Sequence, residues 1–387
     1  MQSKSIKGKS TDEVKAALEH SMADGYIPNV AFVFISIKQD RDAISTMLTE
    51  NNIDVIGATS CTEFIDGHQD EDSIVILLLD LNKNYYKILF KSIEENQLGD
   101  VATQLAKSAL QIFQNPSFIL LTTSITTDGN IMDGEAIIRN MEKALGKEFN
   151  LFGGMAGDDL SFTGSYVFTN NNSTGYGMVA LVMDADKINL HGMVISGWKP
   201  IGVSKTITKS EGNTVYTIDD NPALDVYMRY LGTAVPNYDT QLQFFENLGN
   251  QYPFQIEREN REPLMCNPIR FDKVSKALTF ETNVKQGSRF RFSTPPDFDI
   301  METIVQQATQ LKESKQPDVN ADALLIFSCA GRLAALGPMA KMENERLKDV
   351  WNAPMAGFYS YGEFGRGING KHEFHSTTNS WVALKEK

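Results

Sequence analysis

The sequence VAFVFISIKQDRDAISTMLTENNIDVIGA, residues 30–58, decides the fold class. Its first part, Val30–Ile37, is rich in β-branched and aromatic residues, which is typical of a strand. Asp40 then suits the N-cap of a helix, and apolar residues within 44–48 recur at helical spacing. Because Asp54–Ala58 is a second strand-like segment, the whole stretch predicts a βαβ unit.

The alternation of strand and helix continues along the chain. Ile74–Leu81 is a nearly continuous apolar run of strand length, as expected for a central strand that is covered on both faces. Within 165–198, strand-like runs are separated by Asn, Gly and Asp residues, which favours antiparallel hairpins. The stretch 232–252 is rich in loop-forming residues and predicts a domain boundary. We therefore expect two α/β domains, residues 1–230 and 231–387, with mixed β-sheets flanked by helices.

Composition and charge narrow the class of protein. Hydrophobic residues make up 42% of the chain and charged residues 22%, values that are typical of globular proteins. The net charge of −13 repels phosphate backbones and anionic lipid surfaces, so nucleic acid is a poor partner. No apolar run approaches the roughly 20 residues that span a bilayer, and the N-terminus lacks the apolar stretch of a signal peptide. We expect a cytoplasmic protein without membrane insertion.

The cysteines and histidines leave few chemical options. The three cysteines have no close spacing, which excludes a disulfide scaffold and CxxC motifs. Cys329 follows a strand, and it is either a nucleophile with His375 as its base or a small buried side chain. The five histidines form no HExxH motif, which argues against a closed metal site. A haem, which needs only one axial histidine, stays open as an alternative.

Two segments of the sequence have the same layout. Phe118–Ser124 is a strand that ends in small polar residues, and a helix and the glycine-rich turn 153–159 follow it. Ala323–Arg332, a helix and the turn 357–363 come in the same order with similar spacing. A duplicated βαβ element and a chance similarity between two common units both stay open.

Glycine-rich turns at strand ends are the candidate sites, because open α/β sheets place ligands there. None of them fits the GxxxxGK[ST] or GxGxxG patterns, so nucleotide binding is unsupported. Arg332 offers a planar donor fork that suits a ligand carboxylate; the alternative is an arginine that ties its loop to a nearby acid or to carbonyls. Asp158, Asp159 and Glu363 suit a ligand ammonium, or else they stabilise their own turns.

These segments also carry a resemblance to a known family. The chain resembles the FIST family, sensory domains of bacterial signalling proteins, over nearly its whole length. The N-terminal FIST pattern is similar to VIGATSCTE (55–63), LFGGMAGDD (151–159) and GWKPIG (197–202). The C-terminal FIST pattern is similar to FSCAGR (327–332) and GFYSYGE (357–363). Family members often end with His-Asn-Gln-Thr, where this chain has HSTT at 375–378.

The resemblance implies a small-molecule sensor with amino acids or related compounds as ligands. A branch of the family resembles haem-dependent nitric-oxide sensors. We expect no catalytic residue, no metal ligand and no cofactor; the alternatives are a haem-binding sensor and a hydrolase or transferase that depends on Cys329. Because the two FIST parts take up nearly all 387 residues, any output is expected from a separate signalling protein such as a kinase or a cyclase.

The resemblance also supports a set of candidate ligand-binding residues. They are Arg332, Glu363, Asp158, Asp159, Cys329, Tyr359, Tyr361 and Ser60. We expect the two parts of the chain to pack on each other, with the turns at Gly153 and Gly357 in one cleft. In the corresponding hypothesis for a small zwitterion, Arg332 holds the carboxylate, the acids hold the ammonium, and the tyrosines exclude water.

Overall fold

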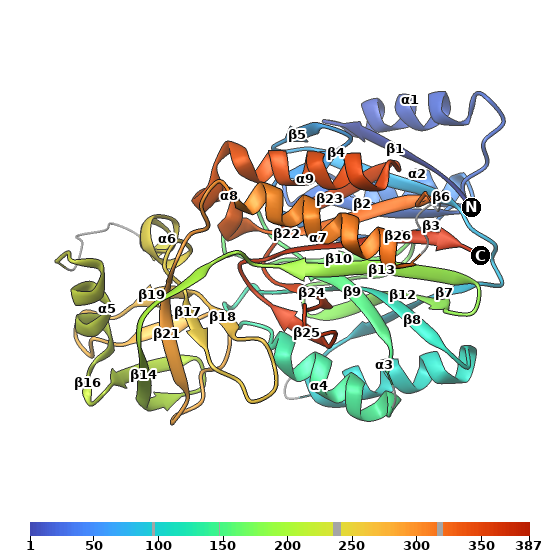
Figure 1. Ribbon diagram of the computed structural model, residues 1–387. Helices are drawn as coiled ribbons and strands as arrows, with labels where there is room; N and C mark the ends of the chain where they lie inside the picture. Colours follow the sequence, from blue (N-terminus) through green and yellow to red (C-terminus); the bar gives the residue numbers. More distant parts are fainter. Residues whose placement is uncertain (95–96, 147, 235–240, 316–319) are drawn as a thin grey trace.

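Three β-sheets with the same strand order form the body of the molecule (Figure 1). The computed structural model describes residues 1–94, 97–146, 148–234, 241–315 and 320–387. The sheets run β1-β6-β2-β3-β10-β11, β7-β12-β8-β9-β24-β25 and β13-β26-β22-β23-β4-β5. The central pair of each sheet (β2/β3, β8/β9 and β22/β23) is parallel, and the strands beside it are antiparallel. The predicted α/β fold with mixed sheets flanked by helices is confirmed.

The first repeat contains the predicted βαβ unit as β2, α2 and β3. Its elements are β1 (Gln2–Gly8), α1 (Thr11–Met22), β2 (Val30–Ser36), α2 (Arg41–Glu50), β3 (Asp54–Ser60), β4 (Glu63–Ile65), β5 (His68–Asp70) and β6 (Ile74–Asp80). Asp40 caps α2 as expected, because its side chain accepts hydrogen bonds from the N–H groups of Asp42 and Ala43.

The second and third repeats follow the same order. The second comprises β7 (Tyr86–Ser92), α3 (Leu98–Ile112), β8 (Pro116–Thr122), α4 (Gly134–Leu145), β9 (Asn150–Met155), β10 (Val167–Phe168), β11 (Ser173–Thr174) and β12 (Gly177–Asp184). The third comprises β13 (Ile188–Ile195), α7 (Ile300–Lys315), β22 (Ala323–Cys329), α8 (Ala330–Leu336), α9 (Pro338–Trp351), β23 (Met355–Ser360), β24 (Glu363–Arg366), β25 (His372–His375) and β26 (Asn379–Glu386). The similarity between the two halves is therefore part of a threefold repeat.

A two-stranded hairpin from each repeat pairs with the sheet of another repeat. The hairpin β4–β5 pairs with β23, β10–β11 pairs with β3, and β24–β25 pairs with β9, so the exchange closes a cycle. At all three junctions a glycine lies opposite a phenylalanine: Gly57 opposite Phe168, Gly153 opposite Phe364, and Gly357 opposite Phe64. A Cβ atom on Gly57 would lie 2.3 Å from the ring of Phe168, and one on Gly357 would lie 2.4 Å from the ring of Phe64. Any larger residue at these two positions would therefore clash with the phenylalanine opposite.

The inner faces of the three sheets meet in one apolar core. Phe34, Phe327 and Phe358, from β2, β22 and β23, contact one another with ring centroids 4.7–6.1 Å apart. Helices cover the outer faces: α1 and α2 lie on the first sheet, α3 and α4 on the second, and α7 and α9 on the third (Figure 1). No helix in the described part of the chain is both long and apolar enough to cross a membrane.

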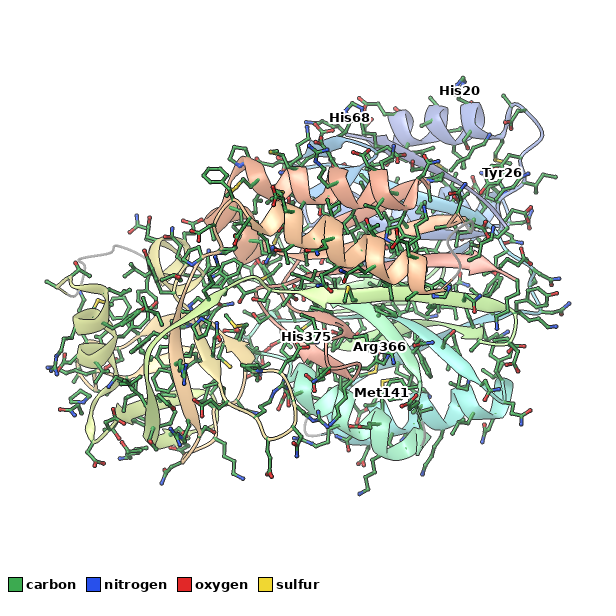
Figure 2. The ribbon with its side chains drawn as sticks, in the orientation of Figure 1. His20, Tyr26, His68, Met141, Arg366 and His375 are labelled. Atoms are coloured by element: carbon green, nitrogen blue, oxygen red, sulfur yellow. The ribbon has the colours of Figure 1, made fainter. Side chains whose placement is uncertain are left out.

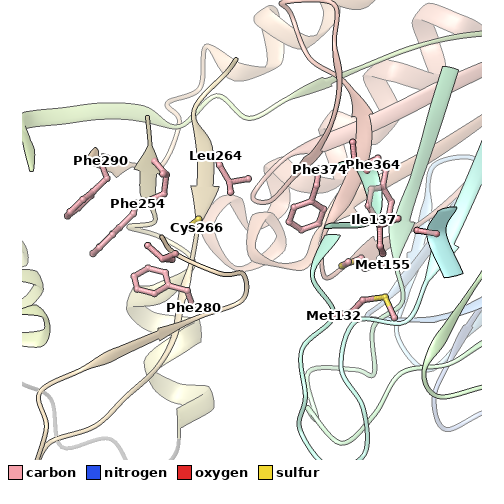
Figure 3. Close-up of a cluster of buried hydrophobic side chains, with 14 of the residues drawn as sticks. Met132, Ile137, Met155, Phe254, Leu264, Cys266, Phe280, Phe290, Phe364 and Phe374 are labelled. Carbon is pink, nitrogen blue, oxygen red and sulfur yellow. The ribbon is translucent and has the colours of Figure 1, made fainter. Parts of the chain in front are cut away.

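An inserted domain, residues 199–294, interrupts the third repeat between β13 and α7. Its elements are β14 (Lys199–Glu211), β15 (Thr214–Ile218), β16 (Asn221–Pro222), α5 (Ala223–Leu231), α6 (Gln241–Phe244), the π-helix η1 (Phe245–Gly249), β17 (Phe254–Ile256), β18 (Leu264–Cys266), β19 (Pro268–Phe271), β20 (Leu278–Phe280) and β21 (Arg289–Thr294). Its aromatic side chains continue into the body in one apolar cluster, which reaches Met132 and Met155 (Figure 3).

The strands within 165–198 form only part of the antiparallel hairpins that the sequence predicts. Within 165–198, β10 and β11 form a hairpin, but β12 and β13 do not pair with each other. They join different sheets because β12 closes the second repeat and β13 opens the third. Strands from both predicted domains, 1–230 and 231–387, share two sheets of the body and the sheet of the inserted domain, so the two parts pack on each other as expected.

Candidate functional site

A cavity lies where the parallel strands of the second and third sheets end beneath the inserted domain. The body contributes Ser124, Met155, Cys329, Ser360 and Tyr361 to its lining, among other residues. The inserted domain contributes Phe245, Asn267, Ile269 and Glu281. The volume is about 50 Å³, which leaves room for a few water molecules. Its position at carboxyl ends of parallel strands is the usual place of a ligand in an α/β fold.

Glu281 is the unusual polar group of this cavity. Its Oε1 accepts a hydrogen bond from the backbone N–H of Asn267 at 2.7 Å, whereas Oε2 is buried and has no partner among the described residues. Burial raises the pKa of Glu281 to about 8. The Ser376 hydroxyl is close enough to the Glu281 carboxyl group to lower its pKa, but its geometry is not that of a hydrogen bond to Oε2. The raised pKa leaves Glu281 largely protonated at neutral pH, and an ammonium group that approached Oε2 would favour the ionised form, whose free oxygen then accepts its hydrogen bond.

Three hydroxyl groups of the cavity lining, those of Ser124, Ser360 and Tyr361, use their hydrogens within the protein, whereas Ser376 Oγ accepts a hydrogen bond from Asn267 Nδ2 at 2.9 Å. Ser124 Oγ donates to the carbonyl oxygen of Ala156 at 2.6 Å. Ser360 Oγ pairs with Glu363 Oε1 at 2.7 Å. The Tyr361 hydroxyl donates to Asp158 Oδ1 at 2.6 Å. Any further hydrogen bond from these three oxygens to a ligand would therefore have to be an accepted one.

Arg332, the first candidate for a ligand carboxylate, is fully buried, and each of its three side-chain nitrogens has a hydrogen-bond partner in the protein. Its Nε donates to Glu343 Oε2 at 3.0 Å, and Nη2 pairs with Oε1 of the same side chain. Nη1 donates to the carbonyl oxygens of Ser196 and Thr377, and the guanidinium lies 5.3 Å from the ring centroid of Trp198. The structure thus shows the alternative, an arginine that ties its loop to an acid and to carbonyls. A ligand carboxylate would have to displace Glu343.

Glu363 and its counterpart in the first repeat have the same surroundings. Glu363 accepts hydrogen bonds from Ser360 and, at 2.7 Å, from the Thr378 hydroxyl. Glu63 pairs with Ser60 and accepts from the Ser73 hydroxyl at 2.6 Å. Burial raises the pKa of Glu363 to about 8 and that of Glu63 to about 7. Both acids bridge two ends of their own repeat.

The remaining candidates lie beside the cavity or away from it. Asp158 accepts hydrogen bonds from the N–H groups of residues 162–164, so it stabilises its own turn, as the alternative interpretation states. Asp159 binds the hydroxyl of Ser36 in the first sheet. The Tyr359 hydroxyl donates to Gln69, outside the cavity lining. Of the sequence-derived candidates, Cys329 and Tyr361 line the cavity, and the turns that follow Gly153 and Gly357 meet there as predicted.

The structure gives Cys329 no histidine within the described lining of the cavity. Burial raises the pKa of its thiol well above the usual value, which disfavours the thiolate. Figure 2 shows His20 and His68 at the surface near α1 and β5, and His375 inside the body. Burial lowers the pKa of His375 to about 3.

Neither described cavity presents a histidine nitrogen that is free to bind a haem: His375 Nε2 is buried without a partner, but His375 lines neither the cavity beside Glu281 nor the cleft beside His372. A haem requires an axial ligand that faces an apolar cavity. His372 lines a separate surface cleft of about 560 Å³, but both of its ring nitrogens contact protein atoms, Leu151 O and Asn150 Oδ1. Searched over the described residues, the structure has no group of three or more His, Cys, Asp or Glu side chains that could hold a metal ion.

Five polar residues of the cavity lining were not among the candidates from the sequence: Ser124, Asn267, Glu281, Ser360 and Ser376. One local signal for Glu281 is its position directly after the strand Leu278–Phe280, where an acid follows an apolar run. Ser360 was present in the glycine-rich turn that contains Tyr359 and Tyr361, but sequence alone does not show which face of a turn is turned toward a cavity. Contact between these residues depends on how the inserted domain packs on the body.

Comparison with known protein families divides the chain at a different place from the boundary between body and inserted domain. The model of the FIST N domain matches residues 29–221, and the model of the FIST C domain matches residues 223–366. The two matches meet inside the inserted domain, between β16 and the start of α5. A search of curated proteins found no match.

Proposed function

The chain belongs to the FIST family, whose domains are sensory domains of signal transduction proteins, and from this premise we propose that it senses a small metabolite such as an amino acid or a related compound. The metabolite binds in the cavity between the strand ends and the inserted domain, and an amino group of the ligand contacts Glu281. The protein binds its ligand without transforming it and needs no cofactor. It acts in the cytoplasm and passes the signal to a separate protein, such as a kinase or a cyclase.

One observation carries this proposal: the buried Oε2 of Glu281, which lacks a partner in the described part of the chain and belongs to the lining of the cavity. Leaving such an atom unpaired costs about 1–3 kcal/mol, and a ligand donor would remove this penalty. The inserted domain supplies the acid, and the body supplies the opposite wall. Ligand binding would therefore change how the two parts pack, which gives the sensor a signal to transmit.

A thermal-shift screen of amino acids and related metabolites tests the proposal. A ligand at 100 times its Kd adds about 2.7 kcal/mol to the free energy of unfolding, which raises the Tm measurably. We expect Glu281→Gln to lose the response, and Glu211→Gln, a change of an exposed acid in the same inserted domain, to keep it. An equal response of both variants would place the ligand elsewhere and contradict the proposed site.

A further inference from the structure

We infer that the ligand of this cavity is a small organic amine that bears no carboxylate. The inference rests on the proposed function; within its class of amino acids and related compounds it selects amines and excludes the amino acids themselves. It depends on three properties of the lining: the direction of its hydrogen bonds, the sign of its charge and the nature of its apolar wall.

The direction of the hydrogen bonds favours a ligand with several donors. Ser124, Ser360 and Tyr361 direct their hydrogens to protein acceptors, so they offer lone pairs to the cavity. Glu281 adds a buried carboxyl oxygen that has no partner among the described residues and that accepts a hydrogen bond once an ammonium group favours its ionised form. An ammonium group carries three donors and no acceptor, as the lysine side chain does, and therefore matches this set.

The charge of the lining disfavours an anion. In the part of the chain that the structure describes, no Lys, Arg or His lines the cavity. Arg332 lies nearby in sequence, but its fork is occupied by Glu343 and two carbonyl oxygens. A carboxylate in the cavity would lose its hydration without gaining a cation, which is strongly unfavourable. The net charge of −13 also favours the approach of a cation over that of an anion.

The rest of the wall is apolar and aromatic. Phe162 stacks on Tyr361 with ring centroids 5.3 Å apart and meets Phe245 edge to face at 5.6 Å. Aromatic faces attract cations, and the neighbouring side chains of Ile125 and Ile269 suit an alkyl group. Because the cavity has a volume of about 50 Å³, the ligand is a compound of a few heavy atoms, unless the inserted domain moves outward.

A matched set of three compounds tests the inference: isobutylamine, valine and isovalerate share a branched alkyl group and differ in their charged groups. We expect isobutylamine to bind by calorimetry with a Kd about tenfold or more below those of valine and isovalerate. We expect Glu281→Gln to weaken isobutylamine by about tenfold or more, and Glu211→Gln to leave its Kd unchanged. Isobutylamine should also slow the alkylation of Cys329, with Cys266, which is buried outside the cavity, as the internal reference.

The outcomes separate this inference from the proposed function. If valine binds as tightly as isobutylamine and Glu281→Gln abolishes its binding, the ligand class is wrong and the sensor site stands. If isovalerate binds best, the charge argument is wrong. If a series of amines from methylamine to phenethylamine and the screened amino acids all fail to bind, both the inference and the proposed site are overturned.

Discussion

The first and third repeats contain the same polar bridge, in which a serine and a second hydroxyl group both bind one buried glutamate, but the two bridges differ in their relation to the cavity. In both, a serine at the end of a parallel strand binds a glutamate three residues later, Ser60 with Glu63 and Ser360 with Glu363. In both, a hydroxyl at the start of the last strand completes the bridge. Only Ser360 lines the cavity, because the inserted domain covers this end of the third repeat. The bridge therefore belongs to the structure of the repeat itself. In the third repeat, the inserted domain covers the bridge and so makes Ser360 part of the cavity lining.

The largest expected effect concerns a feature of the third repeat that the first lacks. Arg332 and Glu343 form an ion pair in which both side chains have no exposed surface. At the corresponding position, three residues after the end of β2, the first repeat has Gln39, which is partly exposed and binds only carbonyl oxygens. We expect Arg332→Met to lower the free energy of unfolding in urea by about 3–5 kcal/mol, because it leaves Glu343 buried and unpaired.

Two controls define this prediction. Gln39→Met should change the free energy of unfolding by about 0.5 kcal/mol or less, as is usual at partly exposed sites. Combining Arg332→Met with Glu343→Leu should recover most of the loss, because no unpaired charge remains. If the double variant is as unstable as the single one, the packing of the arginine, and not its charge, holds the loop.

The next effect is a pH dependence that should differ between the two bridges. Burial raises the pKa of Glu63 to about 7 and that of Glu363 to about 8, from an ordinary value of 4.5. The folded protein therefore holds these protons more tightly than the unfolded chain does. The contribution of these two groups to the free energy of unfolding should decrease as the pH rises from about 4.5 to about 8, by roughly 3 kcal/mol for Glu63 and roughly 5 kcal/mol for Glu363.

Denaturation curves of Glu63→Gln and Glu363→Gln across this range measure the two contributions. Each variant should flatten the pH dependence, because glutamine does not titrate in this range. The effect of Glu363→Gln should extend to higher pH, in line with its higher pKa. Identical profiles for the two variants would show that the inserted domain does not alter the environment of its bridge.

The smallest effect should come from the two serines. Ser60→Ala and Ser360→Ala each remove a hydrogen bond to a buried carboxyl group, so each should lower the free energy of unfolding by about 1–2 kcal/mol. Only Ser360→Ala widens the cavity, so only this variant should speed the alkylation of Cys329, measured by mass spectrometry of the labelled peptide. Faster labelling in Ser60→Ala as well would indicate general loosening of the body.

Local patterns in the sequence predicted much of the fold. The βαβ unit of residues 30–58 followed from periodicity and from the Asp40 cap, which act within a few residues of each other. The hairpin exchange was not predicted, because β4 and β10 have only three and two residues and pair with strands far away in the sequence. The glycines that lie opposite phenylalanines are the clearest sign of the hairpin exchange in the sequence. They also explain some of the glycines in the glycine-rich motifs.

Part of the site was also predicted from local patterns in the sequence. Cys329 is the last residue of β22 and Tyr361 directly follows β23, so both lie at the carboxyl ends of parallel strands, where ligands bind in α/β folds, and both line the cavity. Arg332 also follows a strand, but its partner Glu343 lies on the second of the two helices that follow, and the sequence does not show that α9 folds back onto α8. Glu281 was missed because the burial of one carboxylate oxygen depends on the packing of a separate domain.

The cyclic exchange of hairpins also bears on how the chain matures on the ribosome. Tyr359 and Gln69, which contact each other at the junction of β23 with the first repeat's hairpin, are 290 residues apart. The hairpin β4–β5 therefore leaves the ribosome long before β23, the strand with which β4 must pair. During most of translation the backbone groups along that edge of β4 have no partner strand. Such an open edge invites wrong pairing, so the nascent chain is expected to need shielding by a chaperone until its last strands leave the exit tunnel.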